Sequence, residues 1–154
     1  MQAGARVVFG DFDKHSGEKL AESFSNPSTL PIFVELDVSK YEDNLKLFRT
    51  ALDKFGRVDH AIACAGIVER GKWFDPDLTI ETVEKPETEQ VIEINLLGTL
   101  YFARIAVVYL RHHRKEGEDK SLTLISSAAG FRDSPGLFLY QVRQYVSDGK
   151  TELT

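Results

Sequence analysis

The sequence predicts an α/β fold in which a parallel β-sheet is flanked by helices. Two observations carry this prediction. Short apolar runs, which are typical of buried strands, alternate with longer segments whose apolar residues recur every three or four positions, as in helices. Strands that alternate with helices in this way run parallel, because a helical crossover returns the chain to the same end of the sheet. The alternating segments are residues 6–11, 14–25, 32–38, 40–55, 58–64, 87–115 and 121–126.

The first three elements are bounded by clear signals. The strand over residues 6–11 is an apolar run that ends in an acid, Asp11. The helix over residues 14–25 has apolar residues at helical spacing, and it ends before Pro27 because proline cannot continue a helix. The apolar residues that follow this turn predict a second strand over residues 32–38.

The middle of the chain repeats the pattern. Ser39 is a favourable N-cap residue for a helix over residues 40–55, and Gly56 is the residue type that closes such helices. A third strand is predicted over residues 58–64. A loop rich in glycine, proline and charge follows over residues 67–86.

A long helix is predicted over residues 87–115, and a fourth strand over residues 121–126. The helix is apolar on more than one face, which indicates burial on two sides or a subunit interface. Its uncharged apolar run, residues 94–103, is interrupted by Arg104 and is too short to span a bilayer. We therefore expect no membrane partner.

Composition excludes several classes of protein. A net charge of −5, with its longest basic cluster at residues 111–115, argues against a nucleic-acid partner. The single cysteine, Cys64, excludes an internal disulfide framework and fits a reducing compartment, so cytoplasm is the predicted location. His112 and His113 are adjacent rather than four residues apart, and we predict no metal site.

Three polar residues suggest redox chemistry. Ser127 and Tyr140 lie thirteen residues apart, and Asn95 lies upstream within the apolar pattern of the long helix. A buried amide, a hydroxyl and a phenol in this order along the chain suggest a site that interconverts an alcohol and a ketone.

Together these features resemble the short-chain dehydrogenase/reductase family. The similar segments, in order, are residues 7–11, 36–38, 63–66, 95–99 and 125–130, followed by Tyr140. The resemblance implies a Rossmann-like domain over residues 1–141 and a tail outside the family pattern over residues 142–154. It also implies interconversion of a secondary alcohol and a ketone with a nicotinamide cofactor.

The resemblance assigns roles to the three polar residues. Tyr140 is implied as the general acid/base on the substrate oxygen, and Ser127 as a hydrogen-bond partner of that oxygen. Asn95 is implied to hold a water in the proton relay. The family's lysine, four residues after the tyrosine, is replaced by Gln144. We therefore expect weak or no catalysis, because a neighbouring ammonium is what lowers the pKa of the tyrosine.

The resemblance also implies a cofactor site. Asp11 stands where a carboxylate binds the ribose hydroxyls and repels a 2′-phosphate, which favours NAD over NADP. Asp37 and Val38 stand in the segment that meets the adenine ring. The turn at the end of the third strand, where the family has Asn-Asn-Ala-Gly, is formed here by Ala63 followed by Cys64, Ala65 and Gly66.

Two parts of the family pattern do not appear in these 154 residues. They are the first strand with its glycine-rich turn and helix, and the elements after Tyr140. The first strand separates residues 6–11 from residues 58–64 in the family's sheet order. We expect the two pieces of sheet either to close this gap or to leave bare edges.

Three alternatives remain open at this stage. The chain is also compatible with a non-catalytic binding module that forms homo-oligomers through the helix at residues 87–115. An S-adenosylmethionine methyltransferase also ends its second strand in a ribose-binding acid, but it needs neither Ser127 nor Tyr140. A truncated gene product is the third alternative.

Overall fold

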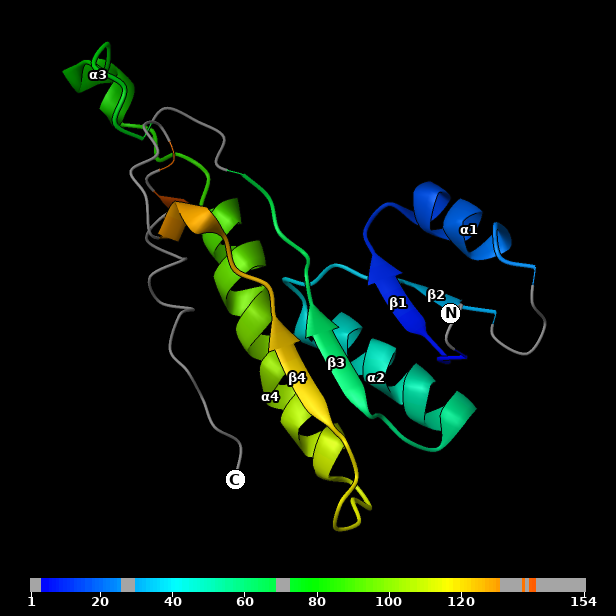
Figure 1. Cartoon of the computed structure of the whole chain (residues 1–154). Helices are drawn as coiled ribbons and strands as arrows, with labels where there is room; N and C mark the ends of the chain where they lie inside the picture. The colour runs from blue at the N-terminus through cyan, green and yellow to red at the C-terminus, as the bar shows by residue number, and fades with distance from the viewer. Residues whose placement is uncertain (1–3, 26–29, 69–72, 131–136, 138, 141–154) are drawn as a thin grey trace.

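The computed structural model describes residues 4–25, 30–68, 73–130, 137 and 139–140. It confirms the predicted α/β class, with parallel strands flanked by helices (Figure 1). The strands are β1 (Val8–Asp11), β2 (Ile32–Glu35), β3 (His60–Ala63) and β4 (Ser121–Leu124). The helices are α1 (Lys14–Glu22), α2 (Tyr41–Phe55), α3 (Ile80–Val83), the π-helix η2 (Ile92–Gly98), α4 (Thr99–Arg111) and the 3-10 helix η3 (Ala128–Gly130).

The described strands form two separate two-stranded sheets. β1 pairs in parallel with β2, with Val8 opposite Ile32, and β3 pairs in parallel with β4, with His60 opposite Ser121. Within the described residues, β1 and β3 do not pair with each other, so each keeps one free edge. Of the two outcomes expected from the sequence, the structure therefore has the bare edges.

The main hydrophobic core lies between α2, α4 and the β3–β4 sheet. The ring of Phe48 on α2 packs against that of Phe102 on α4, with 4.9 Å between their centroids, and against Tyr109 at 5.3 Å. The buried members of this cluster are Phe48, Val58, Ala61, Phe102, Ile105, Ala106 and Leu110.

The β1–β2 sheet is held by a tighter but smaller contact. Gly17 of α1 lies so close to the ring of Phe33 on β2 that a Cβ at this position would be 2.1 Å from the ring. On the other face, Leu36 packs against Gly10, where a Cβ would be 2.5 Å from the leucine side chain. Glycine is needed at both positions because any larger residue would displace the neighbouring side chain.

The region predicted as one long helix is divided. Helical structure runs from residue 90 to residue 111, rather than from 87 to 115, and its first part is the π-helix η2. The predicted loop over residues 67–86 contains the one-turn helix α3, which the sequence analysis missed.

The apolar character of this helix has a structural explanation. By length and composition, the helical segment Ile92–Arg111 is long and apolar enough to cross a membrane. The prediction that this helix is too short to span a bilayer was therefore wrong by this measure. Phe102, Ile105 and Leu110 are buried in the core against α2 and the β3–β4 sheet. This packing accounts for the apolar residues of one face.

A charged network joins the amino-terminal ends of β3 and β4. Arg57 donates hydrogen bonds to Asp59 at 2.8 Å and to Glu118 at 2.9 Å. The side chain of Lys120 is 4% exposed, and its Nζ donates to the Val58 carbonyl at 3.2 Å. These contacts hold the end of the sheet opposite to the one where the candidate site lies.

Candidate functional site

The predicted site residues follow the carboxyl ends of the parallel strands. Asp11 ends β1, Asp37 follows β2, Cys64 follows β3 and Ser127 follows β4. The arrowheads of β1, β3 and β4 point toward the same end of the molecule in Figure 1. This is the end of an open α/β sheet at which ligands bind.

Asp11 is exposed and lies at the turn between β1 and α1. Its Oδ1 accepts a hydrogen bond from the Asp13 backbone N–H at 2.9 Å, and the carboxylate of Asp13 caps α1 by accepting from the Ser16 N–H at 3.0 Å. This bond from the Ser16 backbone is the main reason that the pKa of Asp13 is lowered. The turn thus keeps two carboxylates together, one of them fixed by the cap.

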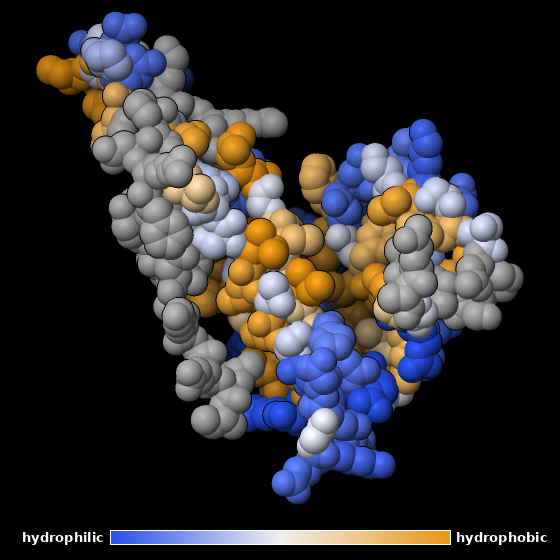
Figure 2. Space-filling view, in the orientation of Figure 1, coloured by the Kyte–Doolittle hydropathy of each residue, from blue (hydrophilic) through white to orange (hydrophobic). Residues whose placement is uncertain are grey.

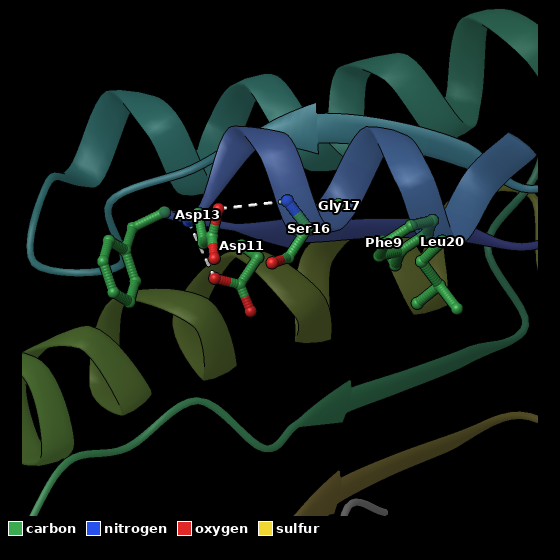
Figure 3. Close-up of a pocket in the computed structure, with 7 residues that line it drawn as sticks. Phe9, Asp11, Asp13, Ser16, Gly17 and Leu20 are labelled. Atoms are coloured by element: carbon green, nitrogen blue, oxygen red, sulfur yellow. Dashed lines mark hydrogen bonds between the residues drawn. The ribbon is translucent and has the colours of Figure 1, made fainter.

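A hollow of about 310 Å³ opens beside this turn (Figure 3). Asp11, Asp13 and Ser16 form its polar part. The lining residues are Phe9, Asp11, Phe12, Asp13, Ser16, Gly17 and Leu20. Asp11 thus presents hydrogen-bond acceptors beside a largely apolar hollow.

Asp37 begins a turn that is fixed by short hydrogen bonds. Its backbone N–H donates to Asp43 Oδ2 at 3.0 Å, and its own Oδ1 accepts from the Ser39 hydroxyl at 2.7 Å and the Ser39 N–H at 3.0 Å. The Ser39 hydroxyl is the largest cause that lowers the pKa of Asp37. Lys40 lies 3.3 Å from the other carboxylate oxygen.

Asn44 is a buried residue of α2 that packs against this turn and was not predicted from the sequence. Its Nδ2 donates to the Val38 carbonyl at 2.8 Å and to the Lys40 carbonyl at 2.9 Å. Its Oδ1 is buried and has no hydrogen-bond partner in the described part of the chain. The available signal was its spacing: an amide one helical turn before Phe48 stands in the apolar stripe of α2.

The turn after β2 also touches η2. A Cβ at Gly98 would lie 2.9 Å from the Val38 carbonyl oxygen and 3.0 Å from its Cγ2. The absence of a side chain at Gly98 therefore lets the helix that carries Asn95 reach the Asp37–Ser39 turn. This contact brings the segments around two predicted site residues, Val38 and Asn95, into one packed unit.

Asn95 is fully buried and holds the loop that follows β3. Its Oδ1 accepts from the Ile67 N–H at 2.8 Å, and its Nδ2 donates to the Ile67 carbonyl at 2.7 Å. Its backbone carbonyl accepts from the Thr99 hydroxyl at 2.7 Å. The side chain thus acts on the backbone next to Gly66, and its implied role with a water stays a prediction.

The segment between β3 and this clamp is open to solvent. Cys64, Ala65 and Gly66 are all exposed. A Cβ at Gly66 would lie 3.3 Å from Asn95 Oδ1, so the short distance between loop and amide favours glycine.

The structure describes both members of the predicted hydroxyl pair. Ser127 is half-buried before η3, and its Oγ accepts from the Ala129 N–H at 3.3 Å. Tyr140 is also half-buried. Residues 131–136 and 138, which connect them, and the tail with Gln144 lie outside the described residues. The catalytic pairing of Ser127 and Tyr140 therefore stays a prediction.

No cluster of three or more histidine, cysteine or acidic residues in the described ranges has a geometry that could hold a metal ion. The polar groups at the carboxyl ends of the strands are carboxylates, an amide and a hydroxyl. Carboxylates accept hydrogen bonds from organic hydroxyls, whereas a serine hydroxyl can also donate a hydrogen bond to a carbonyl oxygen.

Comparisons with known proteins identify related sequences. A family model described as "short chain dehydrogenase" matches residues 1–142. The short-chain dehydrogenase/reductase ascJ of Acremonium egyptiacum is 29% identical over 130 residues, which cover 84% of this chain and 42% of that protein. The 3-hydroxyacyl-CoA dehydrogenase type-2 of Drosophila melanogaster is 26% identical over 150 residues, which cover 96% and 57%. The chain thus spans about half the length of these curated relatives.

Solved structures share the fold. A 3-ketoacyl-(acyl-carrier-protein) reductase from Brucella melitensis complexed with NADH superposes with a TM-score of 0.75 at 24% identity. The match covers 94% of this chain and 56% of that one. The structure of ElxO with NADP bound gives a TM-score of 0.71 at 20% identity, with 94% and 54% covered. At these identities the likeness is one of fold.

Proposed function

Because this chain belongs to the short chain dehydrogenase family, whose members are oxidoreductases, we propose that it binds NAD and interconverts a secondary alcohol and a ketone. Asp11 is the observation that carries the proposal: an exposed carboxylate at the end of β1, beside the hollow in Figure 3. A carboxylate there binds ribose hydroxyls and repels a 2′-phosphate. We propose that the protein acts in the cytoplasm.

The residues at the ends of the strands fit the parts of a dinucleotide. Asp11 would accept hydrogen bonds from the adenosine ribose, and the fixed turn of Asp37 and Val38 would meet the adenine ring. Cys64, Ala65 and Gly66 would form the surface on which the cofactor lies. Hydride transfer is the chemistry that a nicotinamide supplies when bound.

The remaining residues would handle the proton and the substrate oxygen. Ser127 would donate a hydrogen bond to that oxygen, and Tyr140 would give or take its proton. An ordinary tyrosine has a pKa of about 10, so about one in a thousand is ionised at pH 7. Gln144 carries no positive charge that would stabilise a tyrosine phenolate. We therefore propose that proton transfer, and with it catalysis, is weak.

Asn95 supports the site from inside the protein. It holds both backbone polar groups of Ile67, which fixes the loop carrying Gly66. The same helix meets Val38 at Gly98. Asn95 would therefore hold the cofactor-facing loop at Gly66 and the adenine-facing turn at Val38 in fixed positions relative to each other. This would be in addition to any role with a water.

Calorimetric titration with NAD⁺ and NADP⁺ tests the cofactor proposal. We expect NAD⁺ to bind more tightly, and Asp11→Asn to reduce this preference by about tenfold, or about 1.4 kcal/mol. Asp53→Asn, at an exposed position of α2, is the matched control and should change neither affinity. Equal affinities that do not respond to Asp11→Asn would contradict the proposal. Binding of S-adenosylmethionine instead would favour the methyltransferase alternative.

A second copy of the chain is the partner that α4 favours. Leu97, Leu100 and Val108 are exposed and lie on one face of the helix from η2 through α4. Such an apolar stripe is typical of a helix that pairs with its equivalent in a dimer. We expect sedimentation velocity to show a dimer that Leu100→Glu dissociates. Leu20→Glu, which exchanges an exposed leucine of α1, is the control; a monomeric wild-type chain would contradict this assignment.

A further inference from the structure

The segment between β3 and η2 projects from the rest of the molecule, with α3 at its tip (Figure 1). We call residues 73–89 of this segment the acidic arm. The single turn of α3 is stabilised by reciprocal hydrogen bonds: Thr82 Oγ1 accepts from the Thr79 N–H at 2.8 Å, and Thr79 Oγ1 accepts from the Thr82 N–H at 3.3 Å. This capping box gives the tip a defined shape.

The arm exposes large apolar side chains. Ile80 is 81% exposed, Val83 is 65% exposed and Phe74 is 64% exposed. Ile80 and Val83 are three residues apart on one helical turn, so they lie on the same face. Figure 2 shows hydrophobic atoms at this projecting end, next to hydrophilic ones. A cluster of this kind on an otherwise polar projection marks an interaction surface.

The charge of the whole protein is concentrated in the same segment. Between residues 75 and 89, six carboxylates stand against the single ammonium of Lys85, which gives −5, equal to the net charge of the whole chain. The remaining residues are therefore neutral overall. The hydroxyl of Thr79 is the main cause that lowers the pKa of Glu81. The carboxylates are Asp75, Asp77, Glu81, Glu84, Glu87 and Glu89.

We propose that the acidic arm docks a basic amphipathic helix of another protein. The apolar face of such a helix would cover Ile80 and Val83, and its lysine or arginine side chains would lie next to Glu81 and Glu84. Anionic lipid surfaces and nucleic acids carry the same sign of charge as the arm and are repelled. A symmetric contact with the arm of a second copy is disfavoured for the same reason.

A synthetic helical peptide of leucine and lysine, about 18 residues long, serves as the probe. A peptide in which glutamate replaces lysine is its matched control. We expect fluorescence anisotropy to show binding of the leucine–lysine peptide only. Raising the salt from about 50 mM to about 500 mM should weaken it, because the attraction is screened.

Two pairs of substitutions test which residues bind. Ile80→Ser with Val83→Ser should weaken the leucine–lysine peptide about tenfold or more, since it removes the apolar contact. Glu81→Gln with Glu84→Gln should weaken it and also reduce its salt dependence. Glu18→Gln with Glu22→Gln removes the same charge from the exposed face of α1 and should have no effect. Circular dichroism confirms that each variant is folded.

Several results would overturn the proposal. One is equal binding of the leucine–glutamate peptide, and another is binding that neither pair of arm substitutions weakens. Binding to phosphatidylglycerol vesicles through Ile80 and Val83 would assign the arm to a membrane. Self-association that Ile80→Ser with Val83→Ser abolishes would assign it to a second copy. NAD⁺ affinity should be equal in the wild type and this variant, which separates the arm from the Asp11 site.

Discussion

The two sheets of this molecule are covered differently. The β1–β2 sheet has α1 on one face, where Gly17 meets Phe33, and its other face buries Val34 and Leu36. Among the described residues, the β3–β4 sheet is covered by α4 on one face. Ala61 on the covered face is 4% exposed, whereas its neighbour Ile62 on the opposite face is 58% exposed.

The better-covered sheet is nevertheless the one with the smaller core. The cluster of buried aromatic and aliphatic side chains lies between α2, α4 and β3–β4. The turns that carry Asp11 and Asp37 depend instead on short local hydrogen bonds and on close backbone packing. Asn95, in contrast, lies on the helix that anchors the core. The two ends of the candidate site are therefore stabilised differently: the Asp11 and Asp37 turns by local hydrogen bonds, and Asn95 by the hydrophobic core.

Phe102→Ala should have the largest effect on this arrangement. It removes a buried ring that packs against Phe48 at 4.9 Å and leaves a cavity in the core shared by α2 and α4. We expect a loss of about 3–5 kcal/mol in the free energy of unfolding, measured by urea denaturation. Lys46→Ala, at an exposed position of α2, should change stability by about 0.5 kcal/mol or less. A similar loss for both variants would show that the α2–α4 contact is not the main core.

Gly17→Ala should act on the other sheet with an intermediate effect. The new Cβ would lie 2.1 Å from the Phe33 ring, so α1 or the ring must move. We expect a loss of about 1–3 kcal/mol. Hydrogen exchange should become faster in β1 and β2 while the Ile67 amide, held by Asn95, keeps its protection. Lys19→Ala, exposed on α1, is the control. Equally faster hydrogen exchange in both sheets would contradict the conclusion that the two sheets are stabilised independently.

Alternation of apolar runs predicted the fold class, because strands and helices differ in the spacing of their buried residues. The parallel pairs β1–β2 and β3–β4 follow from that alternation. The same signal failed within the long helix. Apolar residues at positions 91, 94 and 97 suit an α-helix, whereas the structure has the wider turns of η2 at residues 92–98. A π-helical turn has about one more residue than an α-helical turn, which changes the spacing of apolar residues very little, so the sequence pattern does not reveal η2.

The parts of the candidate site that directly follow a strand could be predicted from the sequence. The parts that depend on contacts between distant segments could not. Asp11 and Asp37 stand directly after apolar runs, and the structure places both at strand ends. The clamp of Asn95 on Ile67 spans 28 positions in the sequence, and the Gly98–Val38 contact spans sixty. Such contacts depend on tertiary packing, which no local pattern encodes.

The smallest expected effect concerns the Asp37 turn and depends on pH. The Ser39 hydroxyl is the main cause of the lowered pKa of Asp37, so its bond stabilises the fold while the carboxylate is ionised. A carboxyl group whose pKa is lower in the folded state stabilises above its unfolded pKa of about 3.9 and loses this contribution as the pH falls through the folded value.

Ser39→Ala should therefore cost about 0.5 kcal/mol at pH 7, since the group is partly exposed and solvent screens the interaction. The difference from the wild type should shrink as the pH is lowered below about 4. Thermal unfolding across this range measures it. Ser23→Ala removes a hydroxyl that bonds only to the Leu20 carbonyl among the described residues, so its effect should not vary with pH. If the Ser39→Ala difference is equally constant, the carboxylate of Asp37 does not hold its turn through this hydroxyl, and the turn rests on Asn44 and Asp43 instead.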